Sequence, residues 1–386
     1  MPRNDLSRSL VAFEQDSTLV AVVELSLKSW LVAGLVPGVE RQPLKKLEAD
    51  LEALVALLHR WRAEAVKAGR RIERIAVAME AGRDGFWLAR CLRDRGIEAY
   101  VMHATSIAVS REHRRAKTDR LDTQVLMRAF LGWLRGEPKH CSMVAIPSLA
   151  EEDAKHPSRE HETLVAERSR IVNKMKAAMV RLGIRGFKVR LHKAAERLAQ
   201  LRTPEGLPIP PHTLAELRRE LARLQLVKEQ IKEIESERQQ ALKRAPQEGT
   251  HPMLLMLARL KGIGIETADM LVHEILSREL RDRKAVARYG GLTGSPDESG
   301  SKRREKGLAR AGNSRVRKGM LQLAWRWTMF QKQSQLTRWF QERTKAAKRD
   351  VRKTMVIALA RKLLIALWRY VTEGELPDGA VLHPAT

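Results

Sequence analysis

Four carboxylates in the first third of the chain have the types and positions needed to hold a divalent metal ion. Glu24 lies near the end of one β-rich run, and Glu80 ends another, RIAVAME. Asp119 and Asp122 stand three residues apart in KTDRLD, at the start of a predicted helix, and so share one side of it. Oxygen-only ligands suit Mg²⁺ or Mn²⁺, and two such ions can bind both the attacking and the leaving oxygen of a phosphodiester. Taken singly, each acid has a structural alternative, since Asp119 and Asp122 are also favourable first-turn acids.

A serine in the last third of the chain is the second candidate. Ser299 lies in PDESGS, on a segment that we interpret as a Gly-flanked loop, and Ser295 and Ser301 are local alternatives. A nucleophilic hydroxyl among guanidinium groups could attack a phosphate while the cations stabilise the developing charge. Chemistry alone favours the simpler alternative, a loop that binds phosphate without catalysis. The cations that follow are Lys302, Arg303, Arg304, Lys306, Arg310, Arg315, Arg317 and Lys318, with Glu305 as the one opposing acid.

Other basic and glycine-containing segments indicate contacts with nucleic acid. Residues 111–120 and 343–369 are rich in Lys and Arg. The run Gly262-Ile263-Gly264 separates two helical segments and resembles a helix-hairpin-helix, whose turn amides can hold a phosphate. Any tight turn between helices can use two glycines, so this motif is a weak signal by itself.

The elements that would position the carboxylates form a predicted mixed α/β domain over residues 15–145. A hairpin followed by strands that alternate with helices is typical of this class. The predicted elements are a β-hairpin over 18–37, an amphipathic helix over 44–69, strands over 74–80 and 98–102, and a helix over 119–134.

The remainder of the chain is predicted to be helical. A basic helix over 160–182 and a Pro/Gly-rich break over 204–211 come first. Leucines and isoleucines then follow at alternating three- and four-residue steps, which is coiled-coil spacing, although a helical hairpin within one protomer fits equally well. We therefore predict a helical or coiled-coil region over 155–248 and a mostly helical domain over 250–372.

Composition agrees with a nucleic-acid-binding protein of the cytoplasm. A chain of 386 residues is too long for a single hydrophobic core of ordinary size, so more than one domain is expected. Its 72 Lys and Arg against 46 Asp and Glu give a formal charge of +26. So large an excess predicts a polyanionic partner, nucleic acid before an anionic membrane surface. Two cysteines cannot form a disulfide framework or a cysteine zinc cluster, and charges interrupt the apolar runs. Secretion and membrane spanning are therefore not expected.

The combination of KTDRLDTQ with the later GLTGSPDESG and GLARAGNSRVRKGML resembles a known family. It is similar to the DEDD-type transposases of insertion sequences, recombinases with a RuvC-like nuclease domain that are related to Piv-type DNA invertases and belong to the bridge-RNA-guided group. The similarity extends from about residue 18 to 370. It includes LVAERSRIVNKMKAAMVRLGI at 164–184 and ARKLLIALW at 360–368.

This resemblance implies a ribonuclease H-like N-terminal domain with Glu24, Glu80, Asp119 and Asp122 as the metal-binding tetrad. It also implies that Ser299 is the nucleophile that forms a phosphoserine link to DNA, in a composite site that uses the tetrad of another subunit. The middle helices would assemble homodimers into tetramers. A structured non-coding RNA would pair with donor and target duplex DNA and choose the sites, in a bacterial cytoplasm near the nucleoid. The residues expected to contact nucleic acid are Lys117, Arg120, Lys302, Arg303, Arg304, Arg310, Asn313, Arg315, Arg317 and Lys318.

The chain departs from the family pattern at two positions, and two other functions stay open. Glu24 stands where the family usually has Asp, and Gly294 stands where it usually has Pro. A metal-dependent nuclease or Holliday-junction resolvase would use the tetrad to activate water and leave no protein–DNA adduct. A non-catalytic nucleic-acid-binding protein would account for the charge and the helices, but not for the four carboxylates.

Overall fold

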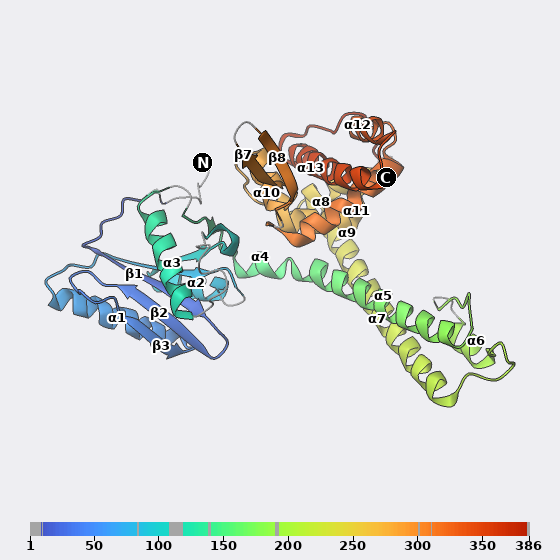
Figure 1. Cartoon of the computed structure of the whole chain (residues 1–386), viewed down its shortest axis with the longest axis horizontal. Coiled ribbons are helices and arrows are strands. Elements are labelled where there is room, and N and C mark those ends of the chain that lie inside the picture. Colours follow the sequence, from blue (N-terminus) through green and yellow to red (C-terminus); the bar gives the residue numbers. More distant parts are fainter. Residues whose placement is uncertain are drawn as a thin grey trace. The chain divides into compact units, whose positions relative to one another are not determined.

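The polypeptide divides into two compact units, residues 1–152 and 153–386. A computed structural model of the chain describes residues 9, 11–82, 85–107, 119–137, 140–189, 193–299, 302–309 and 311–383. The first unit holds the larger sheet, and the second is mostly helical (Figure 1). The predicted regions 155–248 and 250–372 both lie in the second unit.

A six-stranded mixed sheet forms the centre of the first unit, in the order β3-β2-β1-β4-β5-β6. β1, β4 and β5 are parallel, and β2, β3 and β6 pair antiparallel to their neighbours. The predicted mixed α/β class and the hairpin over 18–37 are therefore confirmed. The strands are β1 (Thr18–Leu25), β2 (Ser29–Leu35), β3 (Leu44–Glu48), β4 (Arg74–Glu80), β5 (Glu98–Met102) and β6 (Met143–Val144).

Helices cover both faces of this sheet. α1 (Leu51–Lys67) and α2 (Gly85–Asp94) bury their apolar sides on one face, and α3 (Asp119–Leu134) packs on the other. A short 3₁₀ turn, η1 (Ala104–Ser106), follows β5, and α4 (Leu149–Asp153) ends the unit. The predicted helix over 119–134 is confirmed as α3.

The single helix predicted over 44–69 is wrong in its first part. Leu44–Glu48 forms β3, an edge strand that pairs with β2, and the helix starts only at Leu51. Asp50 sets this start, because its side chain accepts a hydrogen bond of 2.6 Å from the backbone N–H of Ala53. The leucines at 44 and 47 fit a helical stripe in sequence, yet strand pairing satisfies the backbone of that segment instead.

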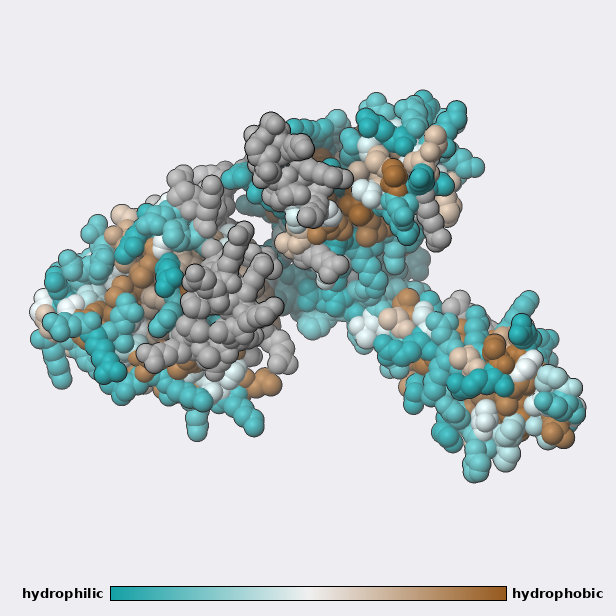
Figure 2. Space-filling model, viewed as in Figure 1, coloured by the Kyte–Doolittle hydropathy of each residue, from teal (hydrophilic) through white to brown (hydrophobic). Residues whose placement is uncertain are grey.

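Two long helices begin the second unit. α5 (His156–Arg181) and α7 (Pro211–Arg244) pack along each other, and α6 (Ala194–Gln200) lies near their far end (Figure 1). Leu217, Leu224 and Ile231 of α7 are buried in the same cluster as residues of α5. Figure 2 shows mostly hydrophilic residues on the visible face of this pair, with more hydrophobic ones toward its α6 end. The heptad stripe is thus buried within one chain, and its use between protomers remains a prediction.

The rest of the second unit is a helical bundle around one apolar core, with a small β-hairpin. None of its described helices, or those elsewhere in the described part of the chain, is long and apolar enough to cross a membrane. The elements are α8 (His251–Ala258), α9 (Ile265–Leu271), the π-helix η2 (Val272–Leu276), α10 (Arg283–Tyr289), β7 (Gly294–Ser299), β8 (Lys302–Leu308), α11 (Ser314–Phe330), α12 (Gln335–Thr344) and α13 (Arg349–Glu373).

Candidate active site and nucleic-acid interface

Two of the predicted metal ligands lie at the ends of neighbouring parallel strands. The register of β1 and β4 pairs Val22 with Ala78, two residues before Glu24 and Glu80. Glu24 and Glu80 therefore occupy the same level, at the carboxyl ends of both strands. Side chains alternate along a strand, so both positions continue the face on which Val22 and Ala78 are buried against α3. Glu24 is partly buried and Glu80 is exposed.

The other two predicted ligands belong to the first turn of α3. Thr123 and Leu126, which this helix buries, lie four residues after Asp119 and Asp122. Because residues four apart share one side of a helix, both aspartates occupy the sheet-facing side of α3. Asp122 is partly buried, and the side chain of Asp119 is outside the described part of the structure. All four positions thus belong to one layer, between α3 and the sheet.

The donor chemistry of these positions fits a hard divalent cation, because every candidate ligand atom is a carboxylate oxygen. The described carboxylates Glu24, Glu80 and Asp122 do not form a closed three-ligand group, however. Among the described residues, one group of three has ligand atoms that all lie within 4.8 Å, and it consists of other residues. Glu24, Glu80 and Asp122, together with Asp119, are the residues that would hold such an ion.

That other group is His161, Glu235 and Glu266, in the second unit. Arg238 forms an ion pair with Glu266 and also pairs with Asp269 at 3.2 Å. The guanidinium already neutralises the acids and would repel a cation, so this group is a structural ion-pair cluster between helices.

Ser299 lies on a β-hairpin, which corrects the interpretation of its segment as a loop. β7 and β8 pair antiparallel, with Ser299 opposite Lys302 and Asp297 opposite Arg304. Of these paired residues the structure describes the backbone, so the register brings the backbone of Ser299 beside that of Lys302. Arg303 lies opposite Glu298, at the alternate positions. The consecutive charged residues KRREK conceal the strand pattern in the sequence, since few side chains there are apolar.

Two glycine-containing segments fix the base of this hairpin. Gly312 has φ +81°, and a Cβ atom there would lie 2.4 Å from the carbonyl oxygen of Arg288. The backbone N–H of Asn313 donates to the carbonyl of Tyr289 at 2.7 Å. The YGG and AGN parts of the motif therefore pack backbone against backbone, which explains why glycine is needed there.

We expect Gly312→Ala to destabilise the protein by at least about 2 kcal/mol, because it adds a backbone collision to an unfavourable positive φ. Urea unfolding measures this loss. Gly307→Ala is the matched control, since Gly307 also has a positive φ of 59° but nothing lies within 4 Å of its Cβ position. Its cost should stay near 1 kcal/mol. Equal losses in both variants would contradict the proposed close approach.

The predicted nucleic-acid contacts at the start of α11 all have partners within the chain. Asn313 caps this helix by accepting hydrogen bonds from the backbone N–H groups of Arg315 and Val316. Arg317 donates to the carbonyl of Ala311 at 3.1 Å. Arg315 and Lys318 both pair with an acid from α5, described below.

Six other predicted contacts are less fully described, and of Lys302, Arg303 and Arg304 the structure describes the backbone only. Lys117 and Arg310 lie outside the described residues, and only the backbone of Arg120 is described, within α3. The Gly262-Ile263-Gly264 segment does join two helices, α8 and α9. Gly262 has φ +96° and packs against Phe330. A Cβ atom added at Gly262 would lie 2.9 Å from the Cβ atom of Phe330. The prediction that this segment separates two helices is confirmed, whereas the helix-hairpin-helix resemblance and phosphate binding remain predictions.

Glu274 is a buried acid that the sequence did not single out. It lies in the π-helix η2, and its side chain is 4% exposed. Its carboxylate accepts hydrogen bonds of 2.8 Å from both Arg159 of α5 and Asn313. Burial raises the pKa of Glu274, but the hydrogen bonds from Arg159 and Asn313 outweigh this effect and hold the pKa below its usual range. One carboxylate thus joins α5 to the cap of α11.

We expect Glu274→Gln to destabilise the folded protein by about 2 to 4 kcal/mol at neutral pH. A carboxyl whose pKa is lower in the folded protein stabilises it fully above the ordinary pKa of about 4.3. That contribution disappears as pH falls toward the folded pKa. The difference in free energy of unfolding between wild type and variant, measured with urea, should therefore stay constant from pH 7 to about pH 5 and narrow below it. The exposed Glu279→Gln is the control. A difference that is constant with pH would contradict this role.

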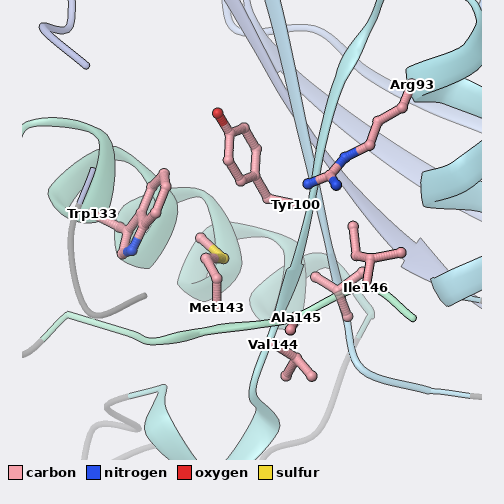
Figure 3. Close-up of a pocket in the computed structure, with 8 residues that line it drawn as sticks. Arg93, Tyr100, Trp133, Met143, Val144, Ala145 and Ile146 are labelled. Carbon is pink, nitrogen blue, oxygen red and sulfur yellow. The ribbon is translucent and has the colours of Figure 1, made fainter. Parts of the chain in front are cut away.

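A cavity of about 370 Å³ lies beside β5 and β6 (Figure 3). Tyr100 and Trp133 line it together with Met143, Val144 and Ile146, and Arg93 reaches it from α2. Of the carboxylate candidates whose side chains are described, Glu24, Glu80 and Asp122 do not contribute to this lining. The cavity is therefore separate from the candidate chemistry.

Comparison with known proteins decides the family. Residues 255–339 match the model described as "Transposase IS116/IS110/IS902 family", and residues 40–184 match a DEDD-type model for transposases of IS110 elements. A protein of Sinorhizobium fredii (strain NBRC 101917 / NGR234), named "Putative transposase y4rJ", is 41% identical over 370 residues, covering 93% of each chain. The chain belongs to the IS110 family of transposases.

Membership of this family makes the protein an insertion-sequence transposase that acts on DNA. The non-catalytic alternative is therefore disfavoured. The DEDD-type match indicates the use of divalent metal ions and includes the positions of Glu80, Asp119 and Asp122. Glu24 precedes the matched residues, so its place beside Glu80 comes from the strand register.

Proposed function

We propose that this IS110-family transposase cuts and rejoins DNA through Ser299, with metal held by Glu24, Glu80, Asp119 and Asp122, at sites that a bound RNA selects. The observation that carries the proposal is the hairpin register, which pairs Ser299 with Lys302 at the start of the basic run. A serine there can meet a backbone phosphate that the cations attract.

The hydroxyl oxygen of Ser299 would attack the phosphorus, a phosphoserine ester would form, and the bond to one DNA oxygen would break. Exchanging one phosphoester for another conserves the bond energy for rejoining, which hydrolysis would lose. A divalent ion, Mg²⁺ or Mn²⁺, held by the four carboxylates would lower the pKa of the attacking hydroxyl and stabilise the leaving oxygen. Arg303, Arg304 and Arg310 would orient the phosphate and offset its charge.

The two halves of this chemistry belong to separate units of the chain. We propose that the tetrad of one subunit acts with the serine of another, in dimers that assemble into tetramers through the α5 and α7 region. The formal charge of +26 provides for backbone contacts with both DNA and a guide RNA. Base pairing by the RNA would then supply the sequence choice that backbone contacts lack.

Two measurements test the proposal. Purified protein is incubated with DNA carrying the ends of its element, with Mg²⁺ or with chelator, and analysed on a denaturing gel. A metal-dependent protein–DNA adduct is expected, whereas nicked DNA without an adduct would favour the nuclease or resolvase alternative.

The guide is tested by sequencing the RNA that co-purifies after a wash at moderate salt. One dominant structured RNA that matches the element's ends and its target is expected. Bulk cellular RNA that is lost as salt rises would overturn RNA guidance and leave a recombinase that reads its own sites.

A further inference from the structure

The start of α5 contacts the bundle of the second unit through two acid–base groups. Arg159 pairs with the buried Glu274, as described above. Glu162, one turn further along α5, pairs with two cations of α11. The second group involves residues that are expected to contact nucleic acid.

The carboxylate of Glu162 holds both cations at once. One oxygen accepts from Arg315 at 2.5 Å, and the other accepts from the amine of Lys318 at 2.6 Å. Arg315 and Lys318 are three residues apart in the first turns of α11, so they project on one side of it. Two cations that converge on two oxygens of one anion form the arrangement with which proteins also hold a phosphate.

This acid has no substitute nearby in the sequence. From Lys306 to Gln341 the chain contains no Asp or Glu, whereas it contains Arg310, Arg315, Arg317 and Lys318. The negative charge at the start of α11 therefore comes from a helix more than 150 residues earlier. Without it, the side chains of Arg315 and Lys318 would present an uncompensated pair of charges.

The two groups differ in how easily they can exchange partners. The side chain of Glu274 is 4% exposed, so its contacts cannot be replaced without unpacking the bundle. Glu162, Arg315 and Lys318 are 36%, 38% and 59% exposed, so another anion can approach. Partial burial raises the pKa of Glu162, but the hydrogen bond from Lys318 and both positive charges outweigh it, and its carboxyl stays ionised. Exposed ion pairs of this kind contribute only up to about 1 kcal/mol to stability. Replacing the Glu162 carboxylate by another anion therefore changes the free energy little.

We propose that Glu162 occupies, in the free protein, the place of a nucleic-acid backbone phosphate, and that Arg315 and Lys318 transfer from this carboxylate to the phosphate on binding. α5 stays attached through Arg159 and Glu274, and only the Glu162 side chain gives way. The carboxylate thereby weakens binding to any nucleic acid. A nucleic acid that makes only weak nonspecific contacts therefore competes poorly with Glu162 for Arg315 and Lys318. This inference rests on the proposed role of the basic segment, but it does not require that Ser299 reacts.

The test compares Glu162→Gln with Glu160→Gln in the full-length protein. Both changes remove one negative charge from α5, and Glu160 is exposed and has no ion pair among the described residues. The probes are a duplex DNA of random sequence and a structured RNA, each titrated by fluorescence anisotropy over a series of salt concentrations. Glu162→Gln should bind about three- to tenfold more tightly than Glu160→Gln.

The same two changes are then made in a variant that already carries Arg315→Gln and Lys318→Gln, which completes a double-mutant cycle between Glu162 and its two cationic partners. There, the extra gain of Glu162→Gln should vanish, and the dependence of log K on log salt should become shallower by about one to two. Equal gains for Glu162→Gln and Glu160→Gln, or a gain that survives in the background variant, would overturn the proposal. A gain with DNA alone or RNA alone identifies which phosphate Glu162 replaces. Because binding is measured, the result is independent of whether strand transfer through Ser299 occurs.

Discussion

Ser299→Ala should abolish the covalent protein–DNA adduct and lower strand exchange by at least about a thousandfold, while DNA affinity changes less than about twofold. The hydroxyl is the only group that alanine removes, and in the proposed site the neighbouring cations would do most of the phosphate binding. The adduct is measured on a denaturing gel, strand exchange by amplifying the recombinant junction, and affinity by anisotropy.

The neighbouring serines provide matched controls. Ser295 lies on the same strand as Ser299, and Ser301 is two residues beyond Ser299. Ser295→Ala and Ser301→Ala should keep both adduct and exchange. Full strand exchange by Ser299→Ala would rule out this residue as the nucleophile, and loss in one of the other two variants would reassign the role.

Asp122→Ala and Asp119→Ala should each reduce metal-dependent cleavage by about a thousandfold or more, which corresponds to roughly 4 kcal/mol of transition-state stabilisation. Each change removes a carboxylate from the first turn of α3, the helix that carries two of the four predicted ligands. Folding should be affected little, because Asp122 is only partly buried and has no buried partner to leave unpaired among the described residues. Cleavage as a function of Mg²⁺ concentration is the measurement, with circular dichroism to confirm the fold.

Asp94→Ala is the control, since it removes the same charge from an exposed position of α2 in the same unit. It should leave the metal dependence unchanged. Cleavage that persists in chelator, or in both aspartate variants, would make the four carboxylates structural and would remove the metal step from the proposed reaction.

Local signals in the sequence were sufficient for the elements that carry the carboxylates. Apolar runs over 18–37 and 74–80 and the helical pattern over 119–134 predicted β1, β2, β4 and α3, because each segment is buried on at least one side. Glu24, Glu80 and Asp119 were placed at element ends for the same reason. Charge, likewise, predicted nucleic acid as the partner, since it is a sum over residues and needs no fold.

Where strand partners are distant in the sequence, or where the side chains of a segment are polar, only the tertiary structure decided which secondary structure that segment forms. β3 lies within an apparent helical stripe, and its pairing with β2 became visible only in the sheet. The β7–β8 hairpin has consecutive charged residues where a typical strand has alternating apolar ones, so periodicity could not reveal it.

The contacts of Glu162 and Glu274 were inaccessible to sequence reasoning for a related reason. They join residues more than 100 positions apart, and an isolated Glu on a charged helix resembles any solvated residue. Residue types and short spacings thus determined the chemistry that this protein has available. The packing of distant helices determined which of its charges are already paired, because an ion pair depends on distance in space and not on separation along the chain.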